Sequence, residues 1–170
     1  GNFFTVREIT EKYDPQVLRF FMLSAHYRSP LNFSADLMQS SKTSLDRILT
    51  AADNLKHLIA NAKDDSMTES ETAHYDASEE YVKKFDEAMD DDFNTADAIA
   101  AIFELVKYLN THTSAENSKS YLQKCLDRLK TLCDILGLVV DKKEELLDAD
   151  IETLIAERQQ ARKEKNFARA

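Results

Sequence analysis

The chain has 170 residues, which is enough for one domain with a hydrophobic core or for two smaller pieces. Its residues are 43% hydrophobic and 31% charged, and no apolar run approaches the ~20 residues that span a bilayer, so we expect a globular protein without a membrane partner. The net charge of −9 would argue against a nucleic-acid partner if it were spread evenly, but residues 64–100 alone carry 13 acidic and 2 basic side chains.

Two Gly and two Pro leave little turn chemistry for β-hairpins, so the composition predicts an all-helical body. Cys125 and Cys133 have neither a metal-binding nor a redox spacing, which indicates a reducing, cytoplasmic setting. The first residues carry neither an initiating Met nor a signal-peptide pattern, so we expect a fragment excised from a longer protein.

Helical signals begin near the N-terminus. Thr5 and Glu8 have the spacing of a capping box and predict a short helix that ends near Lys12. Asp14 and Pro15 then suit the N-cap and first position of a second helix, whose residues 17–23 leave almost no polar face and predict burial nearly all round. Residues 26–34 contain Pro30 and predict an extended link.

The longest predicted helix begins at Ser34 or Asp36 and ends near Lys63. Its apolar residues recur at steps of three and four and form one stripe, made of Leu45, Ile48, Leu49, Ala52, Leu55, Leu58, Ile59 and Ala62. Residues 64–78 are polar and acidic, and predict a mobile connection.

Four further helices are expected in the second half of the chain, over residues 79–89, 95–110, 116–136 and 150–165. In the helix over 95–110, the residues predicted to face inward are Ile99, Ile102, Phe103, Val106 and Leu109. Gly137 suits the position just after the third of them. Helices of these lengths with short loops predict an antiparallel bundle.

Asp90, Asp91 and Asp92 raise the question of a metal site, because clustered carboxylates bind hard cations. The spacing of a calcium-binding loop is missing, and Asp92, Asn94 and Thr95 are residues that cap helices. We therefore interpret this stretch as the turn that starts the next helix.

Other candidates also have ordinary structural interpretations. Glu71 and His74 have the Glu-x-x-His spacing of di-iron bundles, but a second copy is missing and residues 64–78 are expected to form a loop. Cys125 and Cys133 fall on the apolar stripe of their helix, which predicts buried, unreactive thiols.

The C-terminal helix carries a basic stripe. Arg158, Arg162, Lys165 and Arg169 step by four, three and four residues, and Lys163 lies among them. Such a stripe suits phosphates, although solvated helix faces often look the same.

Together, these stretches resemble the part of cysteinyl-tRNA synthetases that follows the catalytic domain. The matching stretches are "GNFFTVREITEKYDPQVLRFFMLSAHYRSPLNFS", "EAMDDDFNTADAIAAIFEL" and "IETLIAERQQARKEKNFARA". Gly1 and Asn2 match the end of that family's KMSKS-type loop.

The resemblance implies an all-α fold, an antiparallel helical bundle like an anticodon-binding domain, preceded by a short helical stem-contact segment. Residues 1–33 would be that segment, residues 34–140 the bundle with a DALR-type domain at about 79–140, and residues 141–170 the start of an anticodon-proximal helix. The resemblance assigns no catalytic residue and no metal-binding residue to this chain. It implies ATP, Mg and Zn as cofactors of the parent enzyme, but no cofactor for this fragment. We expect the fragment alone to be inactive.

The implied partners are tRNA(Cys) and the parent catalytic domain in cis, in a monomeric, cytoplasmic protein. The residues nominated for tRNA contact are Arg7, Arg28, Arg158, Arg162, Lys163 and Lys165. The alternative from the residues alone is a stand-alone helical module that binds a basic protein partner, since the predicted apolar stripes fit that equally well.

Overall fold

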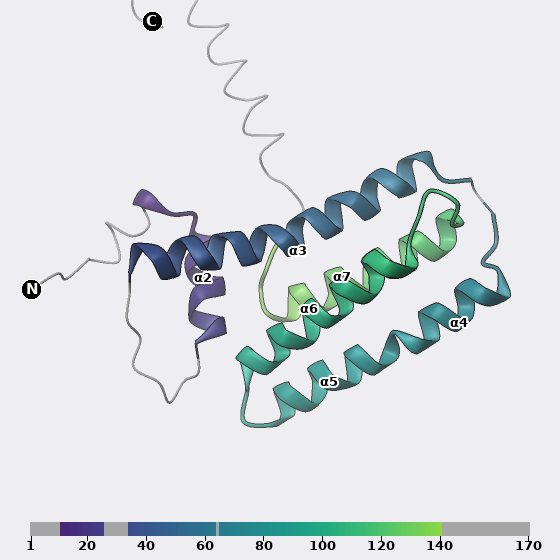
Figure 1. Ribbon diagram of the computed structural model, residues 1–170. Helices are drawn as coiled ribbons and strands as arrows, with labels where there is room; N and C mark the ends of the chain where they lie inside the picture. Colours follow the sequence, from purple (N-terminus) through teal and green to yellow (C-terminus); the bar gives the residue numbers. More distant parts are fainter. Residues whose placement is uncertain (1–10, 26–33, 64, 141–170) are drawn as a thin grey trace, which may run out of the picture. The chain divides into compact units, whose positions relative to one another are not determined.

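The computed structural model describes residues 11–25, 34–63 and 65–140 (Figure 1). In these ranges it contains helices and no strand, which confirms the predicted all-α fold. The helices are α2 (Pro15–Ser24), α3 (Ala35–Asn61), α4 (Glu69–Ala77), α5 (Glu79–Asp90), α6 (Thr95–His112) and α7 (Lys119–Ile135). None of these helices is long and apolar enough to cross a membrane.

The helices run back and forth as an antiparallel bundle, in which α3 packs on α7 and α5 packs on α6 (Figure 1). Helix α4 leads almost directly into α5 along one side, and α2 packs across α3 and against α6. Of the predicted first helix, only residues 11 and 12 are described, and both are helical. The predicted link at 26–34, apart from Ser34, and the predicted helix at 150–165 lie outside the described residues.

Helix α2 begins as predicted but is less buried than predicted. The carboxylate of Asp14 accepts a hydrogen bond from the backbone N–H of Gln16 at 2.7 Å, and Pro15 occupies the first turn. Val17, Phe20 and Phe21 are buried, but Met22 is 52% exposed. Burial nearly all round was therefore wrong, because α3 and α6 leave one side of α2 uncovered.

Helix α3 has the predicted N-cap and the predicted stripe. The Ser34 hydroxyl accepts a hydrogen bond from the backbone N–H of Leu37 at 3.1 Å. The middle of the stripe is buried and its C-terminal part is half-buried against the same core. Met38 and Ala51 were not nominated, but they lie on the same stripe and are buried as well.

The predicted mobile connection at 64–78 contains a helix, so that prediction was wrong. Thr68 and Glu71 form a capping box at the start of α4: the Thr68 hydroxyl accepts from the Glu71 N–H at 3.1 Å, and the Glu71 carboxylate accepts from the Thr68 N–H at 2.9 Å. Two orphan N–H groups are thereby satisfied. The local capping signal outweighs the acidic composition that suggested a loop.

Helix α6 places its apolar residues on a broader face than expected. Ile99, Ile102, Val106 and Leu109 are buried as predicted, and Leu105 is fully buried although it was not nominated. Phe103, predicted to point inward, is half-buried at the edge of the face. Its ring meets the Phe20 ring edge-on, with centroids 6.3 Å apart, so it links α6 to α2.

Helix α7 ends in a Schellman motif, as Gly137 predicted. Gly137 has φ +70°, its N–H donates to the carbonyl of Asp134, and the N–H of Leu138 donates to the carbonyl of Cys133. Leu138 and Val140 then return to the core and are buried. The helix begins at Lys119, three residues later than predicted, because Ser118 is the N-cap.

Candidate functional site

All of the residues nominated for tRNA contact lie outside the described ranges, as do the residues that match the KMSKS-type loop. They are Arg7, Arg28, Arg158, Arg162, Lys163 and Lys165 for the tRNA, with Gly1 and Asn2 for the loop. The described residues instead reveal how the bundle is held together and which surfaces it offers.

The three aspartates lie in the turn between α5 and α6. Asp90 is the last residue of α5, Asp91 is its C-cap, and Asp92 has φ +54°. The cap of α6 is Asn94, whose side chain accepts from the Asp97 N–H at 3.2 Å. The interpretation as a turn is confirmed. Asp92 lies in the turn that follows α5, and Asn94, not Asp92, caps α6.

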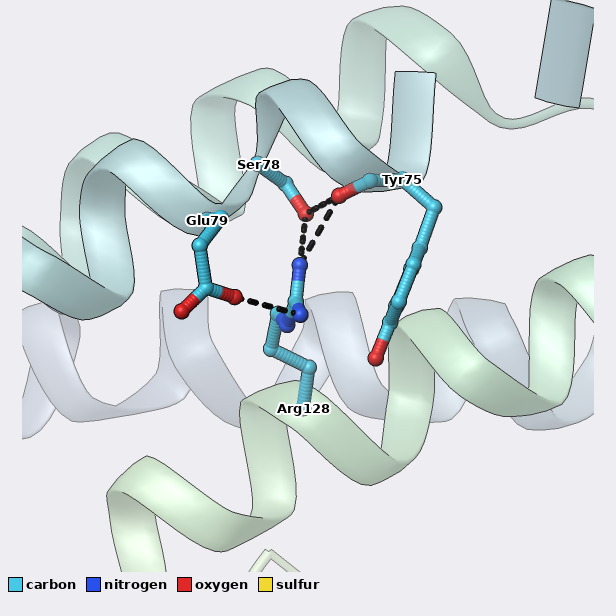
Figure 2. A network of polar contacts seen from close by, with 4 residues as sticks. All are labelled: Tyr75, Ser78, Glu79 and Arg128. Carbon is cyan, nitrogen blue, oxygen red and sulfur yellow. Dashed lines mark hydrogen bonds and ion pairs between the residues drawn. The ribbon is translucent and has the colours of Figure 1, made fainter. Parts of the chain in front are cut away.

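Arg128 on α7 ties together the end of α4 and the start of α5 (Figure 2). One guanidinium nitrogen donates to the Tyr75 carbonyl at 2.8 Å and to the Ser78 hydroxyl at 2.6 Å, and the other reaches Glu79 at 2.7 Å. The guanidinium also lies over the Tyr75 ring, 3.9 Å from its centroid. This planar fork fixes the α4–α5 junction against α7.

Glu71 connects the start of α4 to the start of α7. Besides its capping bond to Thr68, its carboxylate accepts from the Ser118 N–H at 2.9 Å, the Ser118 hydroxyl at 3.2 Å and the Asn117 side chain at 3.1 Å. Burial raises the pKa of this carboxyl group, but the hydrogen bonds from Thr68, Ser118 and Asn117 outweigh burial and hold the pKa below its ordinary value. Glu71 is therefore a buried, ionised side chain that connects the start of α4 to the start of α7.

A polar hollow of about 700 Å³ opens beside Glu71. The start of α4, the end of α6 and the α6–α7 loop line it, and they contribute His74 and His112, whose ring centroids are 4.7 Å apart. Lys63 is the only Lys or Arg among its lining residues, against Asp65, Glu71 and Glu116. This charge balance does not favour a phosphate.

A larger hollow of about 1160 Å³ lies between α3 and α6. Arg47 from α3 lies over the Phe103 ring, 5.1 Å from its centroid, and forms part of the wall. Its lining includes two basic residues, Arg47 and Lys107, and three acidic ones, Asp46, Asp53 and Glu104. Neither hollow therefore has the positive charge that an RNA backbone requires.

A third hollow, of about 450 Å³, lies between α5 and α6 beside the turn. Four carboxylates line it, from Glu87, Asp91, Asp97 and Glu104, against the single amine of Lys84. Hydrogen bonding to Glu104 raises the pKa of Lys84, which also pairs with Glu80. This side of the bundle is its acidic face.

Helix α2 is attached to both α6 and the segment after α7. Arg19 donates from Nε to the Leu136 carbonyl at 3.0 Å, and the Gln16 amide exchanges two hydrogen bonds of 2.9 Å with the backbone of Val139. The Thr95 hydroxyl donates to the Leu23 carbonyl at 2.7 Å. These bonds fix α2 on the bundle, and sequence periodicity gave no signal for them.

The two cysteines are core residues, as predicted. Cys125 is 1% and Cys133 0% exposed. Burial raises the pKa of Cys125 to about 11 and that of Cys133 to about 12, so both thiols stay protonated at neutral pH and are poor nucleophiles.

Comparison with known proteins gives matches over the whole chain. Residues 1–43 match the family described as the tRNA synthetases class I (C) catalytic domain, and residues 84–140 match the family described as the DALR domain. A cysteine–tRNA ligase from Lachnospira eligens is 65% identical over 170 residues, which are 100% of this chain and 36% of the relative. A cysteine–tRNA ligase from Lachnoclostridium phytofermentans is 53% identical over 176 residues, 100% of this chain and 37% of the relative.

The chain belongs to the cysteinyl-tRNA synthetase family. It spans little more than a third of the length of these relatives. Within this synthetase segment, the class I match includes α2 and the beginning of α3, and the DALR match runs from α5 through α7. The bonds of α2 to α6 and to the end of α7 therefore join the two matched parts of the synthetase.

Proposed function

We propose that this chain is the tRNA-docking helical region of a cysteine–tRNA ligase, in which an upstream catalytic domain attaches cysteine to tRNA(Cys) with ATP. The observation that carries the proposal is 65% identity with a cysteine–tRNA ligase over every residue of the chain. The DALR match supports a role in holding the tRNA near its anticodon. The protein would then act in the cytoplasm.

The division of labour within the chain is part of the proposal. Residues 1–33 would contact the acceptor stem, residues 34–140 would form the bundle, and residues 141–170 would lead toward the anticodon. The acidic face of α5 and α6 would turn away from the RNA, because phosphates are repelled by it. The tRNA contacts would come from the basic residues nominated above.

The chemistry of activation would belong to the parent's catalytic domain, with ATP, Mg and Zn as its implied cofactors. The described residues include no group of three or more His, Cys, Asp or Glu side chains that could hold a metal ion. The described residues therefore do not fit a zinc site. The role of this region is to bind and orient RNA.

The test compares the 170-residue chain with the full-length ligase. We expect the full-length protein to catalyse cysteine-dependent ATP–pyrophosphate exchange and to charge tRNA(Cys), and the chain alone to do neither. A chain that catalyses the exchange by itself would contradict the division of labour. A full-length protein that charges no tRNA would favour the stand-alone interaction module.

A further inference from the structure

The turn between α5 and α6 presents an aromatic side chain on a strained backbone. Phe93 is 73% exposed, the highest value among the large exposed hydrophobic residues in the described ranges. It has φ +54°, and so has Asp92 before it. Asp tolerates the left-handed region, but a bulky aromatic residue there is an outlier. Gly or Asn would make the same turn without strain, so the ring itself needs an explanation.

Hydrogen bonds on both sides hold the turn in this conformation. The Phe93 N–H donates to the Met89 carbonyl at 3.3 Å, the Asn94 N–H donates to the Ala88 carbonyl at 3.0 Å, and the Phe93 carbonyl accepts from the Thr95 N–H at 2.7 Å. Strained residues persist where the surrounding structure fixes them, and they cluster at functional surfaces. The fold thus presents the Phe93 ring at a defined place.

That place is beside the junction between the two matched parts of the chain. Thr95, two residues after Phe93, donates from its hydroxyl to the Leu23 carbonyl at the end of α2. Helix α2 lies in the stretch that matches the class I catalytic domain, and the turn lies in the stretch that matches the DALR domain. The exposed ring of Phe93 is therefore two residues away from a contact that the chain already makes with α2, the helix in the catalytic-domain match.

The charge around the ring selects the kind of partner. Asp90, Asp91 and Asp92 precede Phe93 directly, Asp97 follows it, and all four are exposed. These carboxylates would repel RNA phosphates, whereas an apolar protein pocket with Lys or Arg at its rim would be complementary. The chain covers only 36% of its Lachnospira relative, so an enzyme of that length would have further surfaces that this ring could contact.

We propose that Phe93 inserts into an apolar pocket with a basic rim on the catalytic domain of the same polypeptide. The insertion extends the α2–α6 junction and fixes the bundle relative to the catalytic domain. This inference rests on the proposed function, because it requires the chain to be part of such an enzyme.

The test uses the full-length protein with Phe93→Ala and Phe93→Gly, and with Ile135→Ala as a matched control, since Ile135 is 54% exposed on α7. Hydrogen–deuterium exchange and thermal unfolding are measured for each. We expect both Phe93 variants to raise amide exchange about tenfold in one patch of the catalytic domain and to lower the melting temperature, and the control to do neither.

In the isolated 170-residue chain, Phe93→Gly should not lower the melting temperature, in contrast to its effect in the full-length protein. Without the catalytic domain, Phe93→Gly removes backbone strain and leaves the packing of the bundle unchanged, so its melting temperature should stay equal or rise. A fall in the isolated chain as large as in the full-length protein would mean that Phe93 only stabilises the bundle, and would overturn the docking.

Three further results would overturn the proposal. One is unchanged exchange and melting in both full-length Phe93 variants. Another is protection of the turn that appears only when tRNA is added, which would assign the ring to RNA stacking. The third is a dimer that Phe93→Ala abolishes, which would assign it to a second copy. The changes in exchange and melting that support the docking are measured without tRNA, and exchange with tRNA serves only to detect RNA stacking, so a failure of tRNA charging would count against the proposed function alone.

Discussion

Glu71 illustrates how one buried carboxylate stabilises two helices. Its folded-state pKa is below the ordinary value, so its contribution to stability is fully present above that value and is lost as pH falls through the folded pKa. Glu71→Gln leaves the donors of Asn117 and Ser118 without a charged acceptor, and should cost about 1–3 kcal/mol at about pH 7. Urea unfolding measures this cost, with Glu69→Gln, exposed on the same helix, as the control.

The pH dependence separates the charge from the shape of the side chain. As the pH falls through the folded-state pKa of Glu71, which lies below the ordinary value, the wild-type carboxylate gains a proton, so the difference between wild type and Glu71→Gln should shrink. A difference that stays constant while the pH is lowered until Glu71 is protonated in the folded wild type would show that ionisation of Glu71 contributes nothing to folding.

Gly137 combines a backbone requirement with a steric one. Its φ is +70°, and a Cβ built there would lie 2.4 Å from Nη2 of Arg19. Gly137→Ala should therefore cost about 1–2 kcal/mol for the left-handed conformation, and more because the guanidinium must leave the Leu136 carbonyl. In an Arg19→Ala background only the backbone part remains, so a double-mutant cycle should give a coupling above about 0.5 kcal/mol. Strictly additive costs would refute the steric part.

Among the helices, those with clear caps and periodic stripes were predictable from the sequence. Asp14, Ser34 and Gly137 marked ends that the structure confirms, because caps depend on neighbouring residues only. Helix α4 was missed although Thr68 and Glu71 form a capping box, because the acidic composition of residues 64–78 was given more weight. Phe103 was placed too deep and Leu105 overlooked, since the width of a buried face depends on which helices cover it.

The polar joints between helices were not predictable at all. Arg128 and Glu71 are separated from their partners by 46 to 53 residues along the chain, and no local pattern reports such pairs. The same holds for Arg19 and Gln16, which reach residues 136 and 139. Of the candidate site, the sequence therefore supplied a family and a list of basic residues, and none of the joints.

At the scale of the helices, Arg128 on α7 holds the junction between α4 and α5 in place. Arg128→Lys keeps the charge but loses the planar fork to Tyr75, Ser78 and Glu79, and should cost about 1–3 kcal/mol. Glu79→Gln should cost less, about 0.2–1 kcal/mol, since the Glu79 side chain is 47% exposed. Denaturant unfolding gives both numbers. If the two costs are equal, the ion pair dominates the joint and the backbone and hydroxyl bonds do not.

At the scale of the molecule, the separation of charge reconciles a net charge of −9 with the RNA partner that we propose. The described hollows do not favour phosphates, and the acidic face of α5 and α6 repels them. The proposed tRNA binding would then rest on basic residues elsewhere, on the shape of the tRNA and on its phosphates, because side chains cannot read the deep major groove of A-form RNA.

The last prediction concerns the basic stripe of residues 158–169. In the full-length ligase, Arg158→Gln with Arg162→Gln should weaken tRNA binding, and should flatten the dependence of log affinity on log salt by about 0.7–0.9 for each phosphate that the variant no longer neutralises. Lys83→Gln is the matched control, because Lys83 is an exposed cation on the acidic helix α5 and should change neither quantity. Binding measured over a salt series distinguishes the outcomes. If the double variant keeps both the affinity and the slope of the wild type, the stripe is a solvated helix face, and the tRNA-binding residues must be sought among Arg7, Arg28 and the other basic residues.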